Sequence, residues 1–277
     1  METCIELERE GYEVTFLDVD ENGLIDIEEL KEKVRDDTIL VSIMSANNET
    51  GVKQPIKEIG EFLRRRNIFF HVDAVQTIGK EIFYPKEYHI TAFTASAHKF
   101  YGPKGTGFVF LDKNFLIRRQ IDGGHHERSR RAGTENVNGI YGMQKALEYV
   151  YGEIFEAQKT ESRIQSYMED KLTNEVYGIR INGAEAERVR GITNISISGC
   201  NVQTLVVNLD LRGIAVSGGA ACMSGALTES HVLKAMKVSK EELNSSIRVS
   251  IGKYNTQEEI EIFIKNLKEI IKVERGG

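Results

Sequence analysis

The stretch Thr94-Ala-Ser-Ala-His-Lys-Phe-Tyr-Gly-Pro-Lys-Gly105 decides the fold of this chain, together with His71-Val-Asp-Ala-Val-Gln76 upstream. Both stretches follow short apolar runs typical of buried β-strands, so Asp73 and Lys99 are expected at the ends of two strands. A lysine and a carboxylate on neighbouring strand ends are what pyridoxal 5'-phosphate (PLP) chemistry needs. The lysine forms a Schiff base with the cofactor, and the carboxylate keeps the pyridine nitrogen protonated so that the ring can accept electrons.

Strand-like and helix-like segments alternate around these two motifs. The alternation predicts an α/β protein with an open, mostly parallel sheet and helices on both faces. Ligands of such sheets bind outside the carboxyl ends of the strands, where Asn48, Asp73 and Lys99 are expected to lie. The expected strands are residues 12–17, 39–44, 68–72, 90–95 and 107–111, and the expected helices are 27–34 and 56–66.

A long helical region follows at about residues 137–176, with a break expected near Tyr151 and Gly152. We therefore expect two domains, a partial PLP-binding large domain over residues 1–154 and a smaller C-terminal α+β domain over residues 155–277 that carries the loop with Cys222. Strands are expected in the second domain at 179–182, 192–198, 214–216 and 246–251, and helices at 202–211 and 258–273.

Composition excludes several classes of protein. The net charge of −6 over 277 residues argues against a general nucleic-acid binder, which usually carries a basic surplus. No apolar run approaches the ~20 residues of a membrane span, and Met1-Glu-Thr-Cys4 lacks the features of a signal peptide. The three cysteines, Cys4, Cys200 and Cys222, are few and odd in number, which favours the reducing cytoplasm.

The motif around Lys99 resembles, almost residue for residue, the Schiff-base motif of the cysteine desulfurases, which are class V aminotransferase-like enzymes of PLP fold type I. The resemblance runs along essentially the whole chain. It implies that Lys99 binds the cofactor and later moves the α-proton of the substrate. It also implies that Ser96 and His98 hydrogen-bond the cofactor phosphate. Taken alone, Lys99 would be read as an ordinary surface lysine.

Three further positions match cofactor-binding residues of that family. The resemblance implies that Asp73 pairs with the pyridine nitrogen, that Gln76 bonds the ring hydroxyl, and that Asn48 contacts both the ring hydroxyl and the substrate. By residue type alone, Asp73 would be a helix N-cap and Asn48 part of a turn.

Thr134, in the segment Arg131-Ala-Gly-Thr-Glu-Asn136, matches a fourth such position. In the family the matching threonine reaches the phosphate in the partner subunit's site. This implies a homodimer with composite sites.

Two residues of the second half match substrate-handling positions of the family. Cys222, flanked by small residues, matches the cysteine that attacks the substrate sulfur and leaves as a persulfide, although a lone cysteine is usually a buried structural thiol. Arg248 matches the arginine that binds the α-carboxylate of the amino acid, for which its planar fork is suited. The alternative for Arg248 is a salt bridge between domains.

Two patterns suggest metals but are better explained otherwise. Residues Asp18–Glu29 fit the spacing of an EF-hand calcium loop, yet the residues that enter it are strand-like, whereas an EF-hand needs a helix there. His125, His126 and Glu127 are adjacent, and adjacent ligands rarely converge on one ion. No metal is therefore expected.

The family carries a Gly/Thr-rich phosphate turn and a ring-stacking histidine that would both precede Met1. We therefore expect an N-terminally truncated member that lacks the first elements of the sheet. Its cofactor would be held loosely and its activity impaired.

The resemblance implies conversion of L-cysteine to L-alanine, with the sulfur held as a persulfide on Cys222 for iron–sulfur cluster assembly or tRNA thiolation. Expected partners are L-cysteine, a second copy of the chain and a sulfur-acceptor or iron–sulfur scaffold protein; neither a membrane nor direct nucleic-acid binding is expected. Two alternatives stay open. One is a related PLP lyase or aminotransferase, which would not need the Cys222 loop, and the other is a non-enzymatic remnant, which would show no absorption band of bound PLP.

Overall fold

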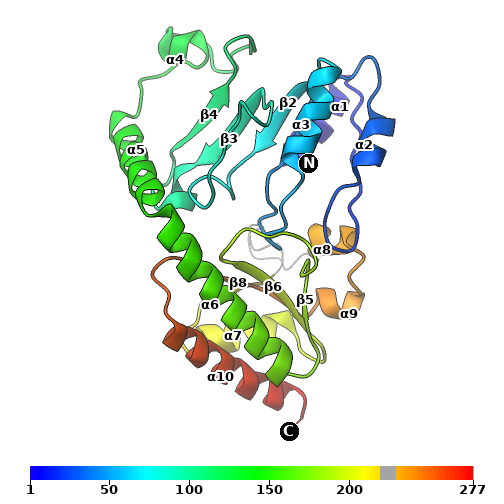
Figure 1. Ribbon diagram of the computed structural model, residues 1–277, viewed down its shortest axis with the longest axis vertical. Helices are drawn as coiled ribbons and strands as arrows, with labels where there is room; N and C mark the ends of the chain where they lie inside the picture. The colour runs from blue at the N-terminus through cyan, green and yellow to red at the C-terminus, as the bar shows by residue number, and fades with distance from the viewer. Residues whose placement is uncertain (219–228, 277) are drawn as a thin grey trace.

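The computed structural model of the chain describes residues 1–218 and 229–276, which form a mixed α/β fold with two four-stranded sheets. The first sheet has the strand order β1-β2-β3-β4 and fills the upper half of Figure 1. Its first three strands are parallel, as predicted, and β4 is antiparallel to β3. The strands are β1 (Leu40–Met44), β2 (Phe69–Asp73), β3 (Ala92–Ser96) and β4 (Gly107–Leu111).

Helix α3 (Ile56–Arg65) packs on one face of this sheet because its apolar residues recur at helical spacing. Ile56, Ile59 and Leu63 are buried, and they share one core cluster with Phe70 of β2. The spacing of these residues predicted this buried face. Two shorter helices, α1 (Glu2–Arg9) and α2 (Ile27–Lys33), precede β1.

The opposite face of β1 and β2 is open. Leu40, Met44 and Phe69 are 47%, 41% and 46% exposed, although strand residues of this kind are usually covered in a parallel sheet. The second layer of helices expected from the sequence is therefore not seen over these two strands in the part of the chain that the structure describes.

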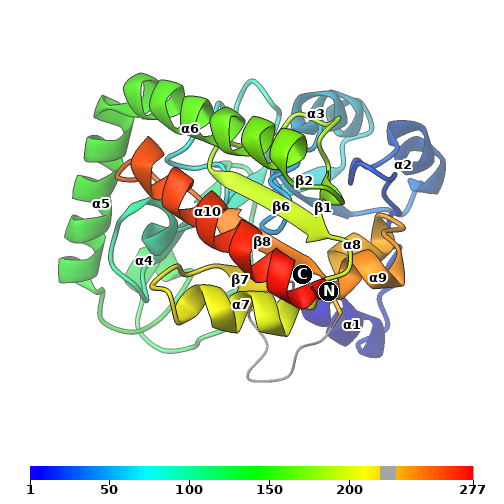
Figure 2. The same cartoon turned by 90° about the horizontal axis from the view of Figure 1, so that it is seen from below.

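The second sheet is antiparallel and has the order β5-β6-β8-β7. Ile195, Leu205, Ile247 and Leu267 have no exposed surface and anchor its own core cluster. In Figure 2, α10 lies across this sheet between α6 and α7. The elements are α6 (Ile154–Glu175), β5 (Ile179–Ile181), β6 (Ile192–Ile197), α7 (Val202–Asp210), β7 (Ser217–Gly218), α8 (His231–Ala235), α9 (Lys240–Leu243), β8 (Ser246–Ser250) and α10 (Gln257–Glu274).

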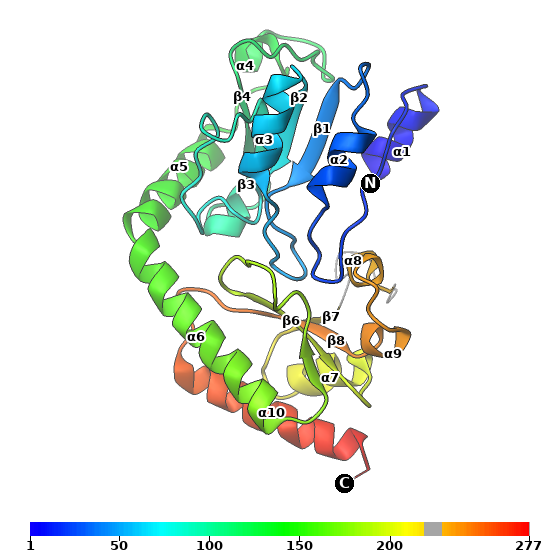
Figure 3. The ribbon, with the colours of Figure 1, turned by 45° about the vertical axis from the view of Figure 1, so that its right-hand side comes forward.

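Two consecutive helices connect the sheets. Helix α5 (Val137–Gly152) begins at Asn136, whose side chain accepts a bond from the Gly139 N–H, and it ends at Glu153, which has non-helical backbone angles. The short helix α4 (His126–Ser129) precedes it. Figure 3 shows α5 beside the first sheet and α6 continuing toward α10. The break falls close to where the sequence predicted it, and the domain boundary at residue 154 stays a prediction.

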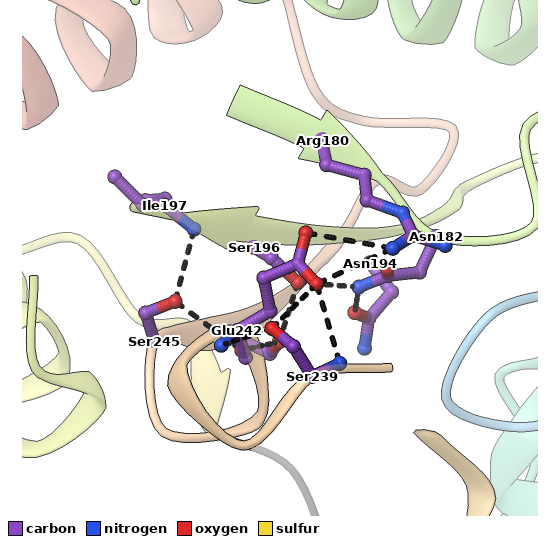
Figure 4. Close-up of polar contacts among 9 residues, drawn as sticks. Arg180, Asn182, Asn194, Ser196, Ile197, Ser239, Glu242 and Ser245 are labelled. Carbon is purple, nitrogen blue, oxygen red and sulfur yellow. Dashed lines mark hydrogen bonds and ion pairs between the residues drawn. The ribbon is translucent and has the colours of Figure 1, made fainter. Parts of the chain in front are cut away.

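A row of buried polar side chains crosses the second sheet (Figure 4). Asn182 Nδ2 donates to Asn194 Oδ1 at 2.7 Å and to Ser196 Oγ at 2.8 Å. The hydroxyls of Ser196 and Ser246 lie 2.7 Å apart, which joins β6 to β8 through side chains as well as backbone. This register places Asn194 directly opposite Arg248.

Two expected strands are not formed. Residues 12–17 make no strand, and only an isolated bridge joins Val19 to Ile25. In place of 214–216, a two-residue strand forms at Ser217–Gly218.

The loop with calcium-like spacing is a turn followed by a helix start. Asp20 Oδ1 accepts from the N–H groups of Asn22 and Leu24, and Asp26 caps α2. The residues that enter this loop are not helical, in line with the interpretation of the sequence. Over residues 1–218 and 229–276, no helix is long and apolar enough to cross a membrane.

Candidate active site

The first site residue, Asp73, ends β2 between the carboxyl ends of β1 and β3. Its carbonyl oxygen accepts hydrogen bonds from the Ser45 N–H at 2.8 Å and the Ser45 hydroxyl at 3.0 Å. Its carboxylate oxygen Oδ1 accepts from the Val75 N–H at 3.0 Å, which fixes the side chain in a local turn. The side chain is exposed, so the carboxylate can receive a further donor.

Lys99 lies in the 3-10 helix η1 (Ala97–Phe100), directly after β3. Phe100 is 1% exposed and anchors this turn in the first core, whereas His98 and Lys99 are exposed residues. The turn closes at Gly102, whose N–H donates to the Ala97 carbonyl at 2.8 Å. Sequence and structure therefore agree that Lys99 and Asp73 follow neighbouring parallel strands.

The turn after β2 is held tightly against η1. At Gly79, which has a φ of +83°, an added Cβ would lie 2.4 Å from Phe100 Cβ, so only glycine fits this approach. Thr77 Oγ1 and Ser45 Oγ lie 2.5 Å apart and tie the same turn to the end of β1. Gln76 is buried within this turn, which brings it to the strand edge that carries Asp73.

Asn48 and Arg248 lie 200 residues apart in the sequence and are in contact. Arg248 Nη1 donates to the Asn48 carbonyl at 2.9 Å, and Nη2 donates to Ser217 Oγ at 3.1 Å. Arg248 Nε is buried and has no partner among the described residues. No carboxylate of residues 1–218 and 229–276 lies within 4.0 Å of this guanidinium, which argues against the salt-bridge alternative.

A second contact connects the same turn to the second half of the chain. The Ser230 hydroxyl donates to Glu49 Oε2 at 2.5 Å, and both residues are less than 5% exposed. Ser230 also caps α8 by accepting from the Leu233 N–H. Glu49 and Ser230 were not predicted as functional, because a contact between positions 181 residues apart leaves no sign in the sequence.

A cluster of charged side chains beneath Lys99 was also missed. Lys80, Lys99 and Arg190 line a cavity of about 40 Å³ between the two halves of the chain. Burial lowers the pKa of Lys80 to about 8, and Glu161 only partly opposes this. Lys80 follows directly on the turn that carries Gln76, but sequence could not show that residues of α6 and of the segment before β6 would cover it.

Two predicted site residues are not placed with the others. Thr134 is exposed before α5, and no hydrogen bond of its side chain to another predicted site residue is seen among the described positions. Cys222 lies outside the residues that the structure describes. The remaining cysteines, Cys4 and Cys200, are free and half-buried, and within residues 1–218 and 229–276 no group of three or more His, Cys, Asp or Glu side chains could hold a metal ion.

The residues at the strand edge fit a PLP molecule in their chemistry. Lys99 offers an exposed amine, and Asp73 offers an accessible carboxylate on the neighbouring strand end. Arg248 adds a buried guanidinium nitrogen that has no partner among the residues described, which suits a carboxylate ligand.

Comparison with known proteins agrees with this assignment. Residues 2–263 match the family described as Aminotransferase class-V. The chain is 41% identical over 273 residues to a Bacillus subtilis protein named putative cysteine desulfurase IscS 1, covering 98% of this chain and 72% of that protein. A solved structure named NifS-like protein superposes with a TM-score of 0.90 at 37% identity, over 98% of this chain and 71% of the other. A structure titled SspA in complex with cysteine gives a TM-score of 0.78 at 30% identity, over 92% and 71%.

The chain belongs to the cysteine desulfurases of the class-V aminotransferase family. This membership confirms the predicted family, the α/β fold class, the enzyme class and PLP as the cofactor. The individual roles of the site residues stay predictions.

Proposed function

We propose that this chain removes the sulfur of L-cysteine and transfers it to Cys222. The carbon–sulfur bond of the substrate breaks, a sulfur–sulfur bond forms on Cys222, and the products are L-alanine and a cysteine persulfide. The observation that carries the proposal is the grouping of Asp73, Lys99 and the Asn48–Arg248 contact at one edge of the parallel sheet.

Bound PLP would supply an electron-accepting ring. Asp73 would hold its carboxylate against a protonated ring nitrogen, and the Val75 N–H would keep that carboxylate in place. Gln76 and Asn48 would bond the ring hydroxyl, while Ser96, His98 and a partner's copy of the Thr134 side chain would bond the phosphate. Lys99 would attach the cofactor through its amine and carry the α-proton of the substrate.

Arg248 would bind the carboxylate of L-cysteine. Its two terminal nitrogens are oriented by the Asn48 carbonyl and by Ser217, and Nε is left without a partner in the described structure. Charge-assisted bonds of this kind are stronger than neutral ones, so the guanidinium would select substrates with a free carboxylate. Asn48 would contact the same substrate from the opposite half of the chain.

Three wider features belong to the same proposal. The chain would work as a homodimer, since Thr134 is exposed and is expected to serve the partner's site. The outer sulfur of the persulfide would pass to a sulfur-acceptor protein or an iron–sulfur scaffold protein. It would serve iron–sulfur cluster assembly or tRNA thiolation. The free thiols of Cys4 and Cys200 favour a reducing compartment such as the cytoplasm.

The test is to load the chain with PLP, reduce it with borohydride and map the pyridoxyl mass. The label should lie on Lys99, should be lost in Lys99→Arg and should persist in the matched control Lys104→Arg. In parallel, Cys222→Ala should abolish sulfide release while PLP absorbance is kept. A label on Lys104, or sulfide release retained without Cys222, would overturn the assignment.

A further inference from the structure

The cavity beneath Lys99 is small and is lined by more cationic than anionic side chains. At about 40 Å³ it has room for roughly three water-sized occupants, too little for an amino acid. Four cationic side chains, Lys80, Lys99, Arg190 and Lys253, line it against two carboxylates, Glu153 and Glu161.

The two carboxylates are already paired. Glu161 Oε2 accepts from Arg190 Nε at 2.7 Å, and the side chains are 8% and 5% exposed. Glu153 lies 3.2 Å from Lys253 Nζ, which also contacts the face of the Tyr149 ring at 3.5 Å from its centroid. Arg190 Nη1 stays buried and has no hydrogen-bond partner within the described residues.

Among the described residues, Lys80 forms no such ion pair. In the part of the chain that the structure describes, no carboxylate lies within 4.0 Å of its amine. Burial is the main reason for its lowered pKa. The charge of Glu161 opposes this in part, and the charges of Arg190, Lys99 and Arg248 lower the pKa further. A half-buried cation outside an ion pair has lost part of its hydration, and an anion in contact with it would offset that cost.

We propose that this cavity binds one small monovalent anion of halide size, held between the Lys80 amine and Arg190 Nη1. Its volume admits such an ion. Arg190 Nη1 is a buried donor without a partner among the described residues, and water alone would satisfy it without neutralising the surplus of positive charge. The anion would lower the positive potential beside Lys99.

The experiment uses the full chain and sodium bromide as the probe. Anomalous scattering from crystals grown in bromide should show one site in contact with Lys80 and Arg190. In solution, chloride at a hundredfold excess over its dissociation constant should raise the thermal midpoint by about 5 °C, relative to gluconate of equal ionic strength.

Lys80→Met should remove this chloride-dependent rise, because methionine fills similar space without charge. Lys57→Met, at an exposed lysine of α3, is the matched control and should keep the rise. A bromide map without density in the cavity, or a chloride effect equal in both variants, would overturn the proposal. The bromide map needs no variant, so the test survives if Lys80→Met does not fold.

Discussion

Replacement of Arg248 by alanine tests the substrate contact most directly. In the structure Arg248 Nη1 donates to the Asn48 carbonyl at 2.9 Å and Nη2 donates to Ser217 Oγ at 3.1 Å. The third nitrogen, Nε, has no hydrogen-bond partner among the described residues. Hydrogen bonds to charged groups contribute ~1.5–3 kcal/mol each. With 1.36 kcal/mol for each factor of ten, loss of the carboxylate contact should raise the KM for L-cysteine about 10- to 150-fold.

The kcat should change much less than the KM, because the carboxylate is bound equally before and during the reaction. The assay is the initial rate of L-alanine formation at varied L-cysteine, with PLP absorbance recorded to show that the cofactor is still bound. Arg248→Lys keeps the positive charge but loses the planar, two-pronged guanidinium, so its KM should lie between those of the wild type and Arg248→Ala.

Ser217→Ala is the matched control, since it removes one neighbour of the guanidinium but leaves the guanidinium itself. Its KM should rise by less than about tenfold. An unchanged KM in Arg248→Ala, or a loss confined to kcat, would show that Arg248 does not bind the substrate carboxylate.

Three further outcomes concern stability. Ser230→Ala should lower the free energy of unfolding by about 2–4 kcal/mol, because it leaves the Glu49 carboxylate buried without its donor and removes a helix cap; in urea unfolding, a loss no larger than that of the exposed cap variant Ser239→Ala would contradict this. Because the pKa of Lys80 is lowered from 10.5 to about 8 when the chain folds, the unfolded chain binds more protons between these values and stability should rise with pH there. In low-chloride buffer, Lys80→Met should reduce this increase in the free energy of unfolding by up to about 3 kcal/mol. An identical pH profile in both proteins would exclude the effect. Ser246→Ala should cost about 1–3 kcal/mol because it removes one of the two partners of the buried Ser196 hydroxyl and the donor to the Glu242 carbonyl, and an unchanged midpoint would argue against a stabilising role for the row of buried polar side chains.

Local patterns predicted most of the fold because they determine most of it. The helical spacing of Ile56, Ile59 and Leu63 identifies the buried face of α3, and the apolar run before Asp73 identifies β2. The prediction of a strand at residues 12–17 was wrong because a strand forms only where a neighbouring strand can pair with it. Sequence alternation cannot show whether such a neighbour is present.

The site was predictable only in part for a related reason. Lys99 and Asp73 carry local motifs, whereas the Glu49–Ser230 contact joins two distant segments. Contacts of that kind arise from the packing of the two halves and have no local pattern.

The row of asparagine and serine side chains in the second sheet also bears on how the chain reaches its active state. Successive strand residues face opposite sides, so a shift of β8 by one position would turn Arg248 toward Ile195 and the apolar core. The same shift would place Asn194 and Ser196 opposite apolar residues of β8 and would break the bond between the Ser196 and Ser246 hydroxyls. Newly made chains with the wrong pairing would thus be unstable and exposed to proteolysis. The chains that persist would be those with the correct strand register and, with it, the correct orientation of Arg248.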